Sequence, residues 1–155
     1  MLSIRMAVES DRPIILSHNT AMAWETERVR LDRATAESGV RAVLANPHLG
    51  FYVVAEEEGK PVASLMVTPE WSDWRNAAFW WIQSVYVRPE YRRRGAYRAL
   101  YAWVKNYAAE VGGVCGFRLY VERENEIAQH AYRALGMQEA HYRMFEEVTE
   151  CLEKE

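Results

Sequence analysis

The stretch from Trp81 to Val111 constrains the fold more than any other part of the sequence, because it joins an apolar strand to an amphipathic helix through one arginine-rich turn. Residues 79–87 have apolar side chains on both faces of an extended segment, which is typical of a strand covered on both sides. Pro89 ends the strand because it has no N–H to donate. Beyond Gly95, apolar residues recur at helical spacing. We therefore expect a strand, a turn and a helix in this order.

The turn concentrates positive charge at the expected start of the helix. Its arginines are Arg88, Arg92, Arg93, Arg94 and Arg98. The first N–H groups of a helix have no acceptor within the helix, and the helix dipole adds partial positive charge, so main-chain groups can hold an anion there. An arginine run in a turn can also be an ordinary solvated surface. The order of strand, glycine and helix favours a site for one or two phosphate groups.

Composition limits the class of protein. A chain of 155 residues is most simply one domain, and its net charge of −3 argues against general nucleic-acid binding, which needs a broad basic surface. Cys115 and Cys151 lie far apart without metal-ligand spacing, so neither a disulfide framework nor a metal site is expected. There is no apolar run of signal-peptide length at the N-terminus and no segment that approaches a membrane span. We expect a cytoplasmic protein.

The chain before the arginine-rich turn predicts one strand, two helices and a three-stranded meander. In chain order, the patterns predict a strand at 2–6, a helix from Ser10 or Asp11 to near Trp24, a second helix from Asp32 to Asn46, and an antiparallel meander at 51–56, 61–68 and 77–87. The connection at 69–76 contains Trp71 and Trp74. A solvent loop gains little from two tryptophans, so we expect them to wall a pocket.

The chain after the long helix predicts one more strand, a helix and a final strand. Residues 117–121 alternate in the manner of a strand, and a crossover helix would place it parallel to the strand that ends at Val87. Asn125 can cap a helix that Gly136 ends. Residues 140–148 offer a last strand, and the acidic remainder is expected to fray.

Two segments of the chain resemble a known family. The first is the run Val85-Tyr86-Val87-Arg88-Pro89-Glu90-Tyr91-Arg92-Arg93-Arg94-Gly95-Ala96-Tyr97-Arg98-Ala99-Leu100, and the second is Leu119-Tyr120-Val121 followed by Asn125, Ala128, Tyr132 and Gly136-Met137. The first resembles the acetyl-CoA motif Gln/Arg-x-x-Gly-x-Gly/Ala of the GNAT superfamily of acyl-CoA-dependent N-acetyltransferases, and the second is similar to that family's second cofactor motif. The resemblance covers nearly the whole chain. The first motif departs from the family at Tyr97, where a small residue is usual, so this ring must point away from the cofactor or cover it.

The resemblance implies an α+β fold of three layers, in a single N-acetyltransferase domain that spans residues 1–155. The central sheet would be mixed and mostly antiparallel, with six to seven strands and about four flanking helices. Its two middle strands would run parallel and splay apart at their C-terminal ends. The pantetheine arm of the cofactor would lie in this gap and bond the unpaired backbone of Val85 and Val87.

The resemblance also assigns the cofactor site. Acetyl-CoA would be the co-substrate, with no metal, and its pyrophosphate would rest on the N–H groups of residues 93–98. The residues expected to bind it are Val85, Tyr86, Val87, Arg92, Arg93, Arg94, Gly95, Ala96, Tyr97, Arg98 and Asn125.

Direct acetyl transfer through a tetrahedral intermediate requires an uncharged amine, a donor to the oxyanion and help for the departing thiolate. An amine with a pKa of about 10.4 is mostly protonated at pH 7, and removal of its proton costs roughly 4 to 5 kcal/mol. Glu25 and Asp73 are the candidate proton acceptors, and each can equally be an ordinary surface carboxylate. Glu25 is preferred because the connection between the first two helices covers the acceptor side in the resembling family. A backbone N–H near Tyr86 or Val87 would stabilise the oxyanion.

Tyr132 is assigned to the leaving thiolate, because it stands two turns beyond Asn125 on the helix that would meet the cofactor. It would hydrogen-bond the sulfur. The acceptor is expected to contact Trp71, Asp73, Trp74 and Gln83. A small-molecule amine is the preferred acceptor. The sequence is compatible with a homodimer and does not determine the oligomeric state. The alternatives are a protein N-terminus or lysine as acceptor, a non-catalytic acyl-CoA-binding domain, or an RNA-binding module that uses the arginines.

Overall fold

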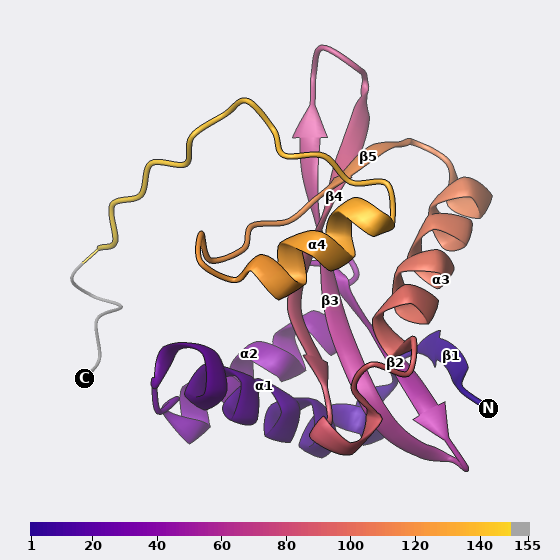
Figure 1. The fold of residues 1–155 in the computed structure, drawn as a ribbon, viewed down its shortest axis with the longest axis vertical. Helices are drawn as coiled ribbons and strands as arrows, with labels where there is room; N and C mark the ends of the chain where they lie inside the picture. The colour runs from indigo at the N-terminus through magenta and orange to yellow at the C-terminus, as the bar shows by residue number, and fades with distance from the viewer. Residues whose placement is uncertain (150–155) are drawn as a thin grey trace. The chain divides into compact units, whose positions relative to one another are not determined.

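The computed structural model describes residues 1–149, which divide into two compact units, Met1–Leu119 and the residues from Tyr120 onward. The first unit is built on one sheet with the strand order β1-β2-β3-β4-β5 (Figure 1). Its strands are β1 (Ser3–Met6), β2 (Phe51–Glu57), β3 (Lys60–Ser72), β4 (Ala77–Val87) and β5 (Val114–Arg118). Its helices are α1 (Arg12–Glu27), α2 (Arg33–Ala45) and α3 (Ala96–Val111), with short 3-10 turns at Glu9–Asp11 and Pro89–Tyr91. The second unit contains α4 (Glu126–Ala134).

The helices of the first unit cover the two faces of the sheet. Strands β1 to β4 are antiparallel, as expected for a meander, and β5 is parallel to β4. On one face, Ile15 of α1 and Val40 of α2 pack with Tyr52 of β2. On the other face, Tyr107 of α3 meets Trp80 of β4, with ring centroids 5.9 Å apart. The layers are therefore helix, sheet and helix, as the α+β assignment predicts.

The first helix is longer than the sequence pattern predicts. It ends at Glu27, and Arg28 adopts the left-handed conformation at its C-cap with φ 57°. We expected the end near Trp24, with Glu25 in the connection, and this boundary was wrong because no glycine or proline interrupts the polar last turn. The Thr26 hydroxyl supports this turn by donating to the Met22 carbonyl oxygen at 2.8 Å. Glu25 is thus held on a helix, which fixes its direction more firmly than a loop would.

The β3–β4 hairpin is the longest part of the sheet and extends past its neighbour β2. The last pair between β2 and β3 is Phe51 with Val67, whereas β3 continues to pair with β4 as far as Ser72 opposite Ala77. Figure 1 shows this hairpin projecting from the rest of the unit. We had predicted that Trp71 lies in a loop, but it lies on β3. Only residues 73–76 form the turn.

The sheet contains five strands within residues 1–149, not the six to seven that we predicted. The strand expected at 117–121 is β5, which starts and ends earlier, because Gly113 already accepts a hydrogen bond from Ala78 N–H at 2.8 Å. Residues 140–148 form no strand. They pair with no strand of the sheet, and Tyr142 and Phe145 are exposed.

Three further expectations concern the ends and the surroundings of the chain. The last helix ends as predicted, with Gly136 at φ 95° just beyond it. The acidic tail that we expected to fray, and Cys151 within it, lie outside the described residues. No helix in the described part of the chain is long and apolar enough to cross a membrane. The assignment of residues 1–155 to a single domain stays a prediction.

We predict that Asp11→Asn lowers the free energy of unfolding by roughly 1 to 3 kcal/mol at pH 7. Asp11 is 5% exposed and its carboxylate accepts hydrogen bonds from Arg5 Nη1 at 2.7 Å and Nη2 at 2.9 Å. The Arg5 guanidinium lowers the pKa of Asp11 in the folded protein. The stabilisation is therefore present above the unfolded pKa and is lost as pH falls through the folded pKa, so the difference between the two proteins should shrink below about pH 4. Urea unfolding at pH 7 and pH 3 measures both values.

Glu9→Gln is the control for this prediction. The Glu9 carboxylate pairs with Arg12 Nη1 at 2.5 Å, but its side chain is 60% exposed. Its loss should change stability by less than about 1 kcal/mol. Equal effects of the two substitutions would contradict a special role for the buried carboxylate.

Candidate active site

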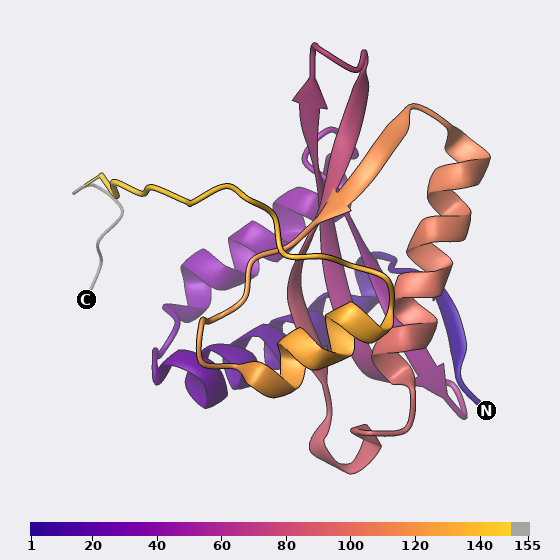
Figure 2. The same cartoon turned by 45° about the horizontal axis from the view of Figure 1, so that its top comes forward.

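Strand β4 loses its parallel partner halfway along its length. β5 pairs with β4 only from Ala78 to Trp81, and residues 82–87 of β4 continue without it (Figure 2). At its end, β4 still bonds β3, because Arg88 N–H donates to the Val62 carbonyl oxygen at 3.0 Å. Main-chain groups alternate in direction along a strand, so those of Val87 point toward the side that β5 has left. β5 thus ends where its pairing with β4 ends, and the splay of the two strands stays a prediction.

A β-bulge changes the direction of β4 near its end, beside the edge that β5 leaves unpaired. Ser64 of β3 is opposite Tyr86, whereas Met66 is opposite Gln83, so β4 has one extra residue between the two pairs. Ser84 takes up the extra length with a left-handed φ of 51°. Such a conformation is costly for a residue with a side chain, and it occurs most often at functional sites. Tyr86 is therefore set in its direction by the backbone.

The arginine-rich turn forms a concave main-chain surface at the start of α3. Arg93 and Gly95 both have positive φ, 62° and 82°. Gly95 is the N-cap, and no side chain caps the helix at this position. A Cβ on Gly95 would meet nothing within 4 Å, so glycine is required there for its conformation and not for space. Successive N–H groups in such a turn, followed by a helix N-terminus, form an anion site.

The arginines of the turn divide into two groups. The Arg92 side chain is engaged in hydrogen bonds within the protein. Its Nε donates to the Val87 carbonyl oxygen at 2.8 Å and its Nη2 donates to Glu25 Oε2 at 2.6 Å. Arg94 and Arg88 form ion pairs with acidic residues, at 3.6 Å and 2.5 Å. Arg93 and Arg98 form no ion pair with any residue that the structure describes. These two are the ones left to meet an external anion.

Glu25 lies where α1 meets the end of β4 that β5 leaves unpaired. Its Oε1 accepts a hydrogen bond from the Tyr86 hydroxyl at 3.3 Å, and its Oε2 accepts the one from Arg92. Burial, together with the negative charge of Glu25, raises the pKa of Tyr86. The Glu25 side chain remains 38% exposed, so water reaches it. The structure thus brings Glu25, Tyr86 and Arg92 together, as their shared assignment to one site requires.

His18 belongs to the same cluster, although we assigned it no role from the sequence. It is 2% exposed, its Nδ1 lies 2.8 Å from Ser64 Oγ, and its ring centroid lies 5.1 Å from that of Tyr86. Burial lowers the pKa of His18 to about 4, so the ring is neutral at pH 7. Its spacing of seven residues from Glu25 places the two on one face of α1, and this was the signal available in the sequence.

Tyr97, the departure from the family motif, is accommodated on α3. Its ring stacks on Tyr101 with centroids 6.1 Å apart and planes 5° apart. Tyr101 in turn meets Phe117 of β5 edge to face at 5.8 Å. The Tyr97 ring therefore lies on the face of α3 that packs toward β5.

The residues predicted to bind the acceptor are not gathered around Glu25. Trp71 and Trp74 are 64% and 89% exposed at the outer end of the hairpin, and Asp73 lies in the turn between them. This turn precedes β4, whereas Tyr86 is near its end, so about 30 Å of strand separates them. Gln83 is nearer, and its Nε2 donates to Thr68 Oγ1 at 2.6 Å across the sheet. Their assignment to an acceptor pocket stays a prediction.

The second unit contains Asn125 and Tyr132. Asn125 Oδ1 accepts a hydrogen bond from Ala128 N–H at 3.1 Å, so its side chain caps α4 as predicted. Tyr132 lies on α4, and burial raises its pKa. Its hydroxyl is therefore protonated at neutral pH and able to donate a hydrogen bond. Across residues 1–149, no group of three or more His, Cys, Asp or Glu side chains could hold a metal ion.

The family model described as Acetyltransferase (GNAT) family matches residues 14–137, which include both β4 and the basic turn. The chain belongs to the GNAT family. It is therefore an acyltransferase, and the resemblance noted in the sequence is confirmed.

Several known proteins similar to this chain are also described as acetyltransferases. The curated relative "Uncharacterized N-acetyltransferase YhfO" of Bacillus subtilis (strain 168) is 28% identical over 138 residues, which cover 89% of this chain and 91% of that protein. A crystal structure of a possible acetyltransferase from Clostridium difficile 630 is 42% identical, with a TM-score of 0.89. The aligned region covers 96% of this chain and 98% of that chain. The structure of AAC(6')-Iy in complex with the bisubstrate analog CoA-S-monomethyl-acetylneamine is 18% identical, with a TM-score of 0.75. The aligned region covers 96% of this chain and 99% of that chain. At this identity, the last comparison shows the shared fold.

We predict that Gly95→Ala lowers the free energy of unfolding by roughly 1 kcal/mol, because a side chain disfavours the left-handed conformation at this N-cap. Gly39→Ala is the matched control, since this residue lies inside α2, and a Cβ there meets nothing within 4 Å. The control should stabilise the protein by about 0.5 to 1 kcal/mol. Denaturant unfolding of both variants measures these opposite signs, and two changes of the same sign would contradict the role given to Gly95.

Proposed function

We propose that this GNAT protein is an N-acetyltransferase that moves an acetyl group from acetyl-CoA to a primary amine of a small molecule, by direct transfer through a tetrahedral intermediate. The observation that carries the proposal is the open edge of β4 directly before a basic turn and an uncapped helix start. An extended chain of amides and a diphosphate need these two features side by side. Acetyl-CoA has both groups.

The residues of the first unit fit such a ligand. The pyrophosphate would rest on the main-chain N–H groups of residues 93–98, with the Arg93 and Arg98 guanidiniums beside it. The pantetheine arm would pair with the main chain of Val85 and Val87 as an added strand. The Val87 carbonyl oxygen already accepts from Arg92, so its N–H is the group left for the ligand. Arg92 then supports the strand end instead of binding phosphate.

The chemistry uses donors and acceptors that this arrangement provides. Acetyl-CoA, when bound, supplies the thioester carbonyl. A main-chain N–H at Tyr86 or Val87 would donate to the oxygen that gains negative charge. Glu25 would take the proton of the amine through water, because both of its oxygens accept hydrogen bonds from the protein and its side chain is still partly exposed. Each carboxylate oxygen has a further lone pair for this purpose.

Tyr132 would hydrogen-bond the departing thiolate. A phenol of ordinary pKa is already a weaker acid than a thiol, by roughly 2 kcal/mol, and burial raises the pKa of Tyr132 further. Full proton donation from the phenol is therefore uphill. A hydrogen bond to sulfur requires only that the hydroxyl stay protonated, and the proton released by the acylated amine finally reaches the thiolate.

The acceptor is a small molecule in this proposal. The aminoglycoside N-acetyltransferase AAC(6')-Iy, which shares the fold, was solved with an analog that joins CoA to acetylneamine. This supports a small amine as acceptor in a protein of this architecture. A protein N-terminus or lysine is the alternative acceptor, and a non-catalytic acyl-CoA-binding domain is the alternative from another class.

We expect the purified protein to release thiol from acetyl-CoA in the presence of a suitable amine, and to bind coenzyme A in calorimetry. Arg98→Gln should weaken coenzyme A binding roughly tenfold, since a charge-assisted hydrogen bond to phosphate is lost. Lys60→Gln, at the exposed β2–β3 turn, is the control of equal charge change and should leave binding unchanged. Binding without thiol release for any amine or peptide would support the non-catalytic alternative, and no binding of coenzyme A would overturn the proposal.

Tyr132→Phe should lower kcat while the KM for acetyl-CoA changes little, because the hydroxyl would act mainly as the thiolate departs. A loss of roughly tenfold to a hundredfold is expected. Steady-state kinetics measure both constants, and Tyr120→Phe is the control for loss of a phenol in the same unit. An unchanged kcat would remove Tyr132 from the mechanism.

A further inference from the structure

A hollow lies beside α1, and it is lined by the end of that helix and by the start of α2. It consists of two adjoining parts of about 410 and 470 Å³ that share Thr20 and Trp24. We call it the Trp24 hollow; its other lining residues are Pro13, Leu16, Ser17, Ala21, Val29, Arg30, Leu31 and Arg33. Both parts are open to solvent, and apolar and polar groups line them together.

The charge at the Trp24 hollow is positive. The guanidiniums of Arg28 and Arg30 lie over the Trp24 ring, at 5.3 Å and 5.1 Å from its centroid. Neither these two nor Arg33 forms an ion pair with a residue in the described part of the chain. An aromatic ring holds a guanidinium in place but does not neutralise it. The three arginines can therefore meet an anion.

The acidic residues of the same segment do not cancel this charge. Glu25 is bonded to Arg92. Asp32 Oδ2 caps α2 by accepting from Thr35 N–H at 3.0 Å. Glu27 and Asp32 therefore remain between residues 24 and 33 against three arginines, which leaves a positive excess of one charge. A polycationic amine would be repelled at this surface, whereas an amine with an anionic group would be attracted.

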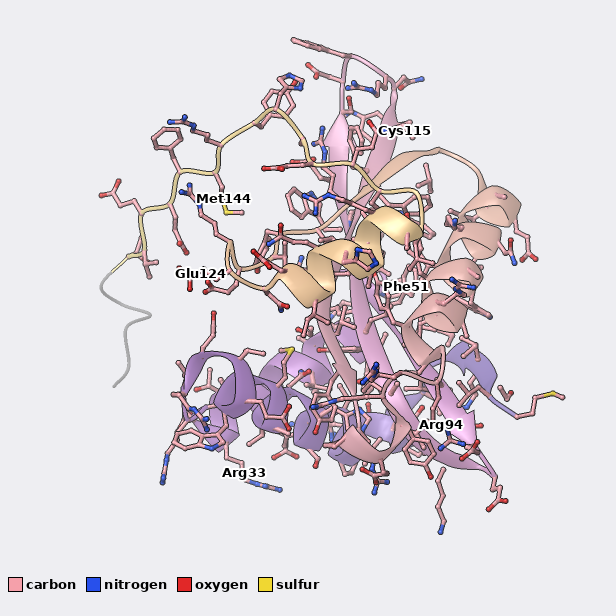
Figure 3. All side chains as sticks on the ribbon, viewed as in Figure 1. Arg33, Phe51, Arg94, Cys115, Glu124 and Met144 are labelled. Carbon is pink, nitrogen blue, oxygen red and sulfur yellow. The ribbon has the colours of Figure 1, made fainter. Side chains whose placement is uncertain are left out.

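The Trp24 hollow is adjacent to the candidate active site. Trp24 precedes Glu25 in α1, and the Glu25 carboxylate contacts the Tyr86 hydroxyl. This basic cluster is also distinct from the one at the turn before α3, since Arg33 and Arg94 lie at separate places in the unit (Figure 3). The first unit thus has one basic site for each of two anionic ligands.

We propose that the acceptor is an amine that carries a carboxylate or phosphate group and an apolar portion, and that it binds in the Trp24 hollow. The anionic group meets Arg30 and Arg33, the apolar portion lies against Leu16 and Val29 of the hollow, and the amine points toward Glu25. This rests on the proposed acetyl transfer and narrows its acceptor class. It separates this protein from an enzyme for polycationic aminoglycosides.

Initial rates of thiol release with matched amines test this inference. The pairs are tryptophan with tryptamine, phenylalanine with phenethylamine, and glucosamine 6-phosphate with glucosamine, with neamine as the polycation. The anionic member of at least one pair should have the higher kcat/KM, by roughly tenfold or more, and the active pair shows whether carboxylate or phosphate is preferred.

A preference for the uncharged members or for neamine would overturn the inference but not the proposed function. If no amine releases thiol, the proposed function fails, and calorimetry with the anionic amines then decides the inference: saturable binding supports it and no binding overturns it.

Two variants locate the site. Arg30→Gln and the double variant Arg30→Gln with Arg33→Gln should raise the KM for the anionic amine by roughly tenfold and more, with a smaller change in kcat. Arg30→Lys should restore part of the loss. Arg41→Gln, which removes one exposed charge farther along α2, is the matched control and should change neither constant. Equal KM values for the control and for the double variant, with circular dichroism showing that both are folded, would overturn the assignment.

Discussion

The unequal lengths of β4 and β5 are the constraint on which the site depends. β4 has 11 residues and β5 has five, so part of the longer strand has a partner on one edge only. A main-chain group without a partner is costly where water is excluded, roughly 1 to 3 kcal/mol for each group. In the proposed binding mode, an extended ligand with amides of its own would pair with this edge. The bulge at Ser84 and the turn at Gly95 lie on either side of the end of β4 that such a ligand would meet.

Arg92 connects the three parts of the chain that surround this edge. It bonds the end of β4 through Val87, the last turn of α1 through Glu25, and it belongs to the turn that leads into α3. The helix that borders the Trp24 hollow is thus joined by one side chain to the segment that would hold diphosphate. A substitution at Glu25 would therefore release Arg92 from α1 as well as remove the carboxylate.

The parts of the site that depend on local sequence could be predicted. The strand, the turn and the helix around Gly95 follow from hydrophobic period and from one glycine, and the cap at Asn125 follows from its side chain. Contacts between distant segments could not. The bond between Glu25 and Arg92 joins residues 67 apart, and no spacing rule indicates it. The six to seven strands were wrong because a strand needs a partner as well as a pattern, and residues 140–148 of the described chain pair with no strand. Trp71 and Trp74 were assigned to a pocket because they are large and apolar. The structure shows them exposed on a long hairpin, and the assignment stays a prediction.

The hairpin beyond β2 also bears on self-association. Past Val67, the outer edge of β3 has no neighbouring strand in the described residues, and Trp71 and Trp74 are exposed close to it. Bare strand edges with aromatic side chains tend to pair between molecules. Pro69 stands on this edge and opposes such pairing because it offers no N–H, whereas the neighbouring Glu70 carboxylate is paired with Arg118 within the chain. One proline thereby disfavours edge-to-edge pairing along the longest strand pair of the fold.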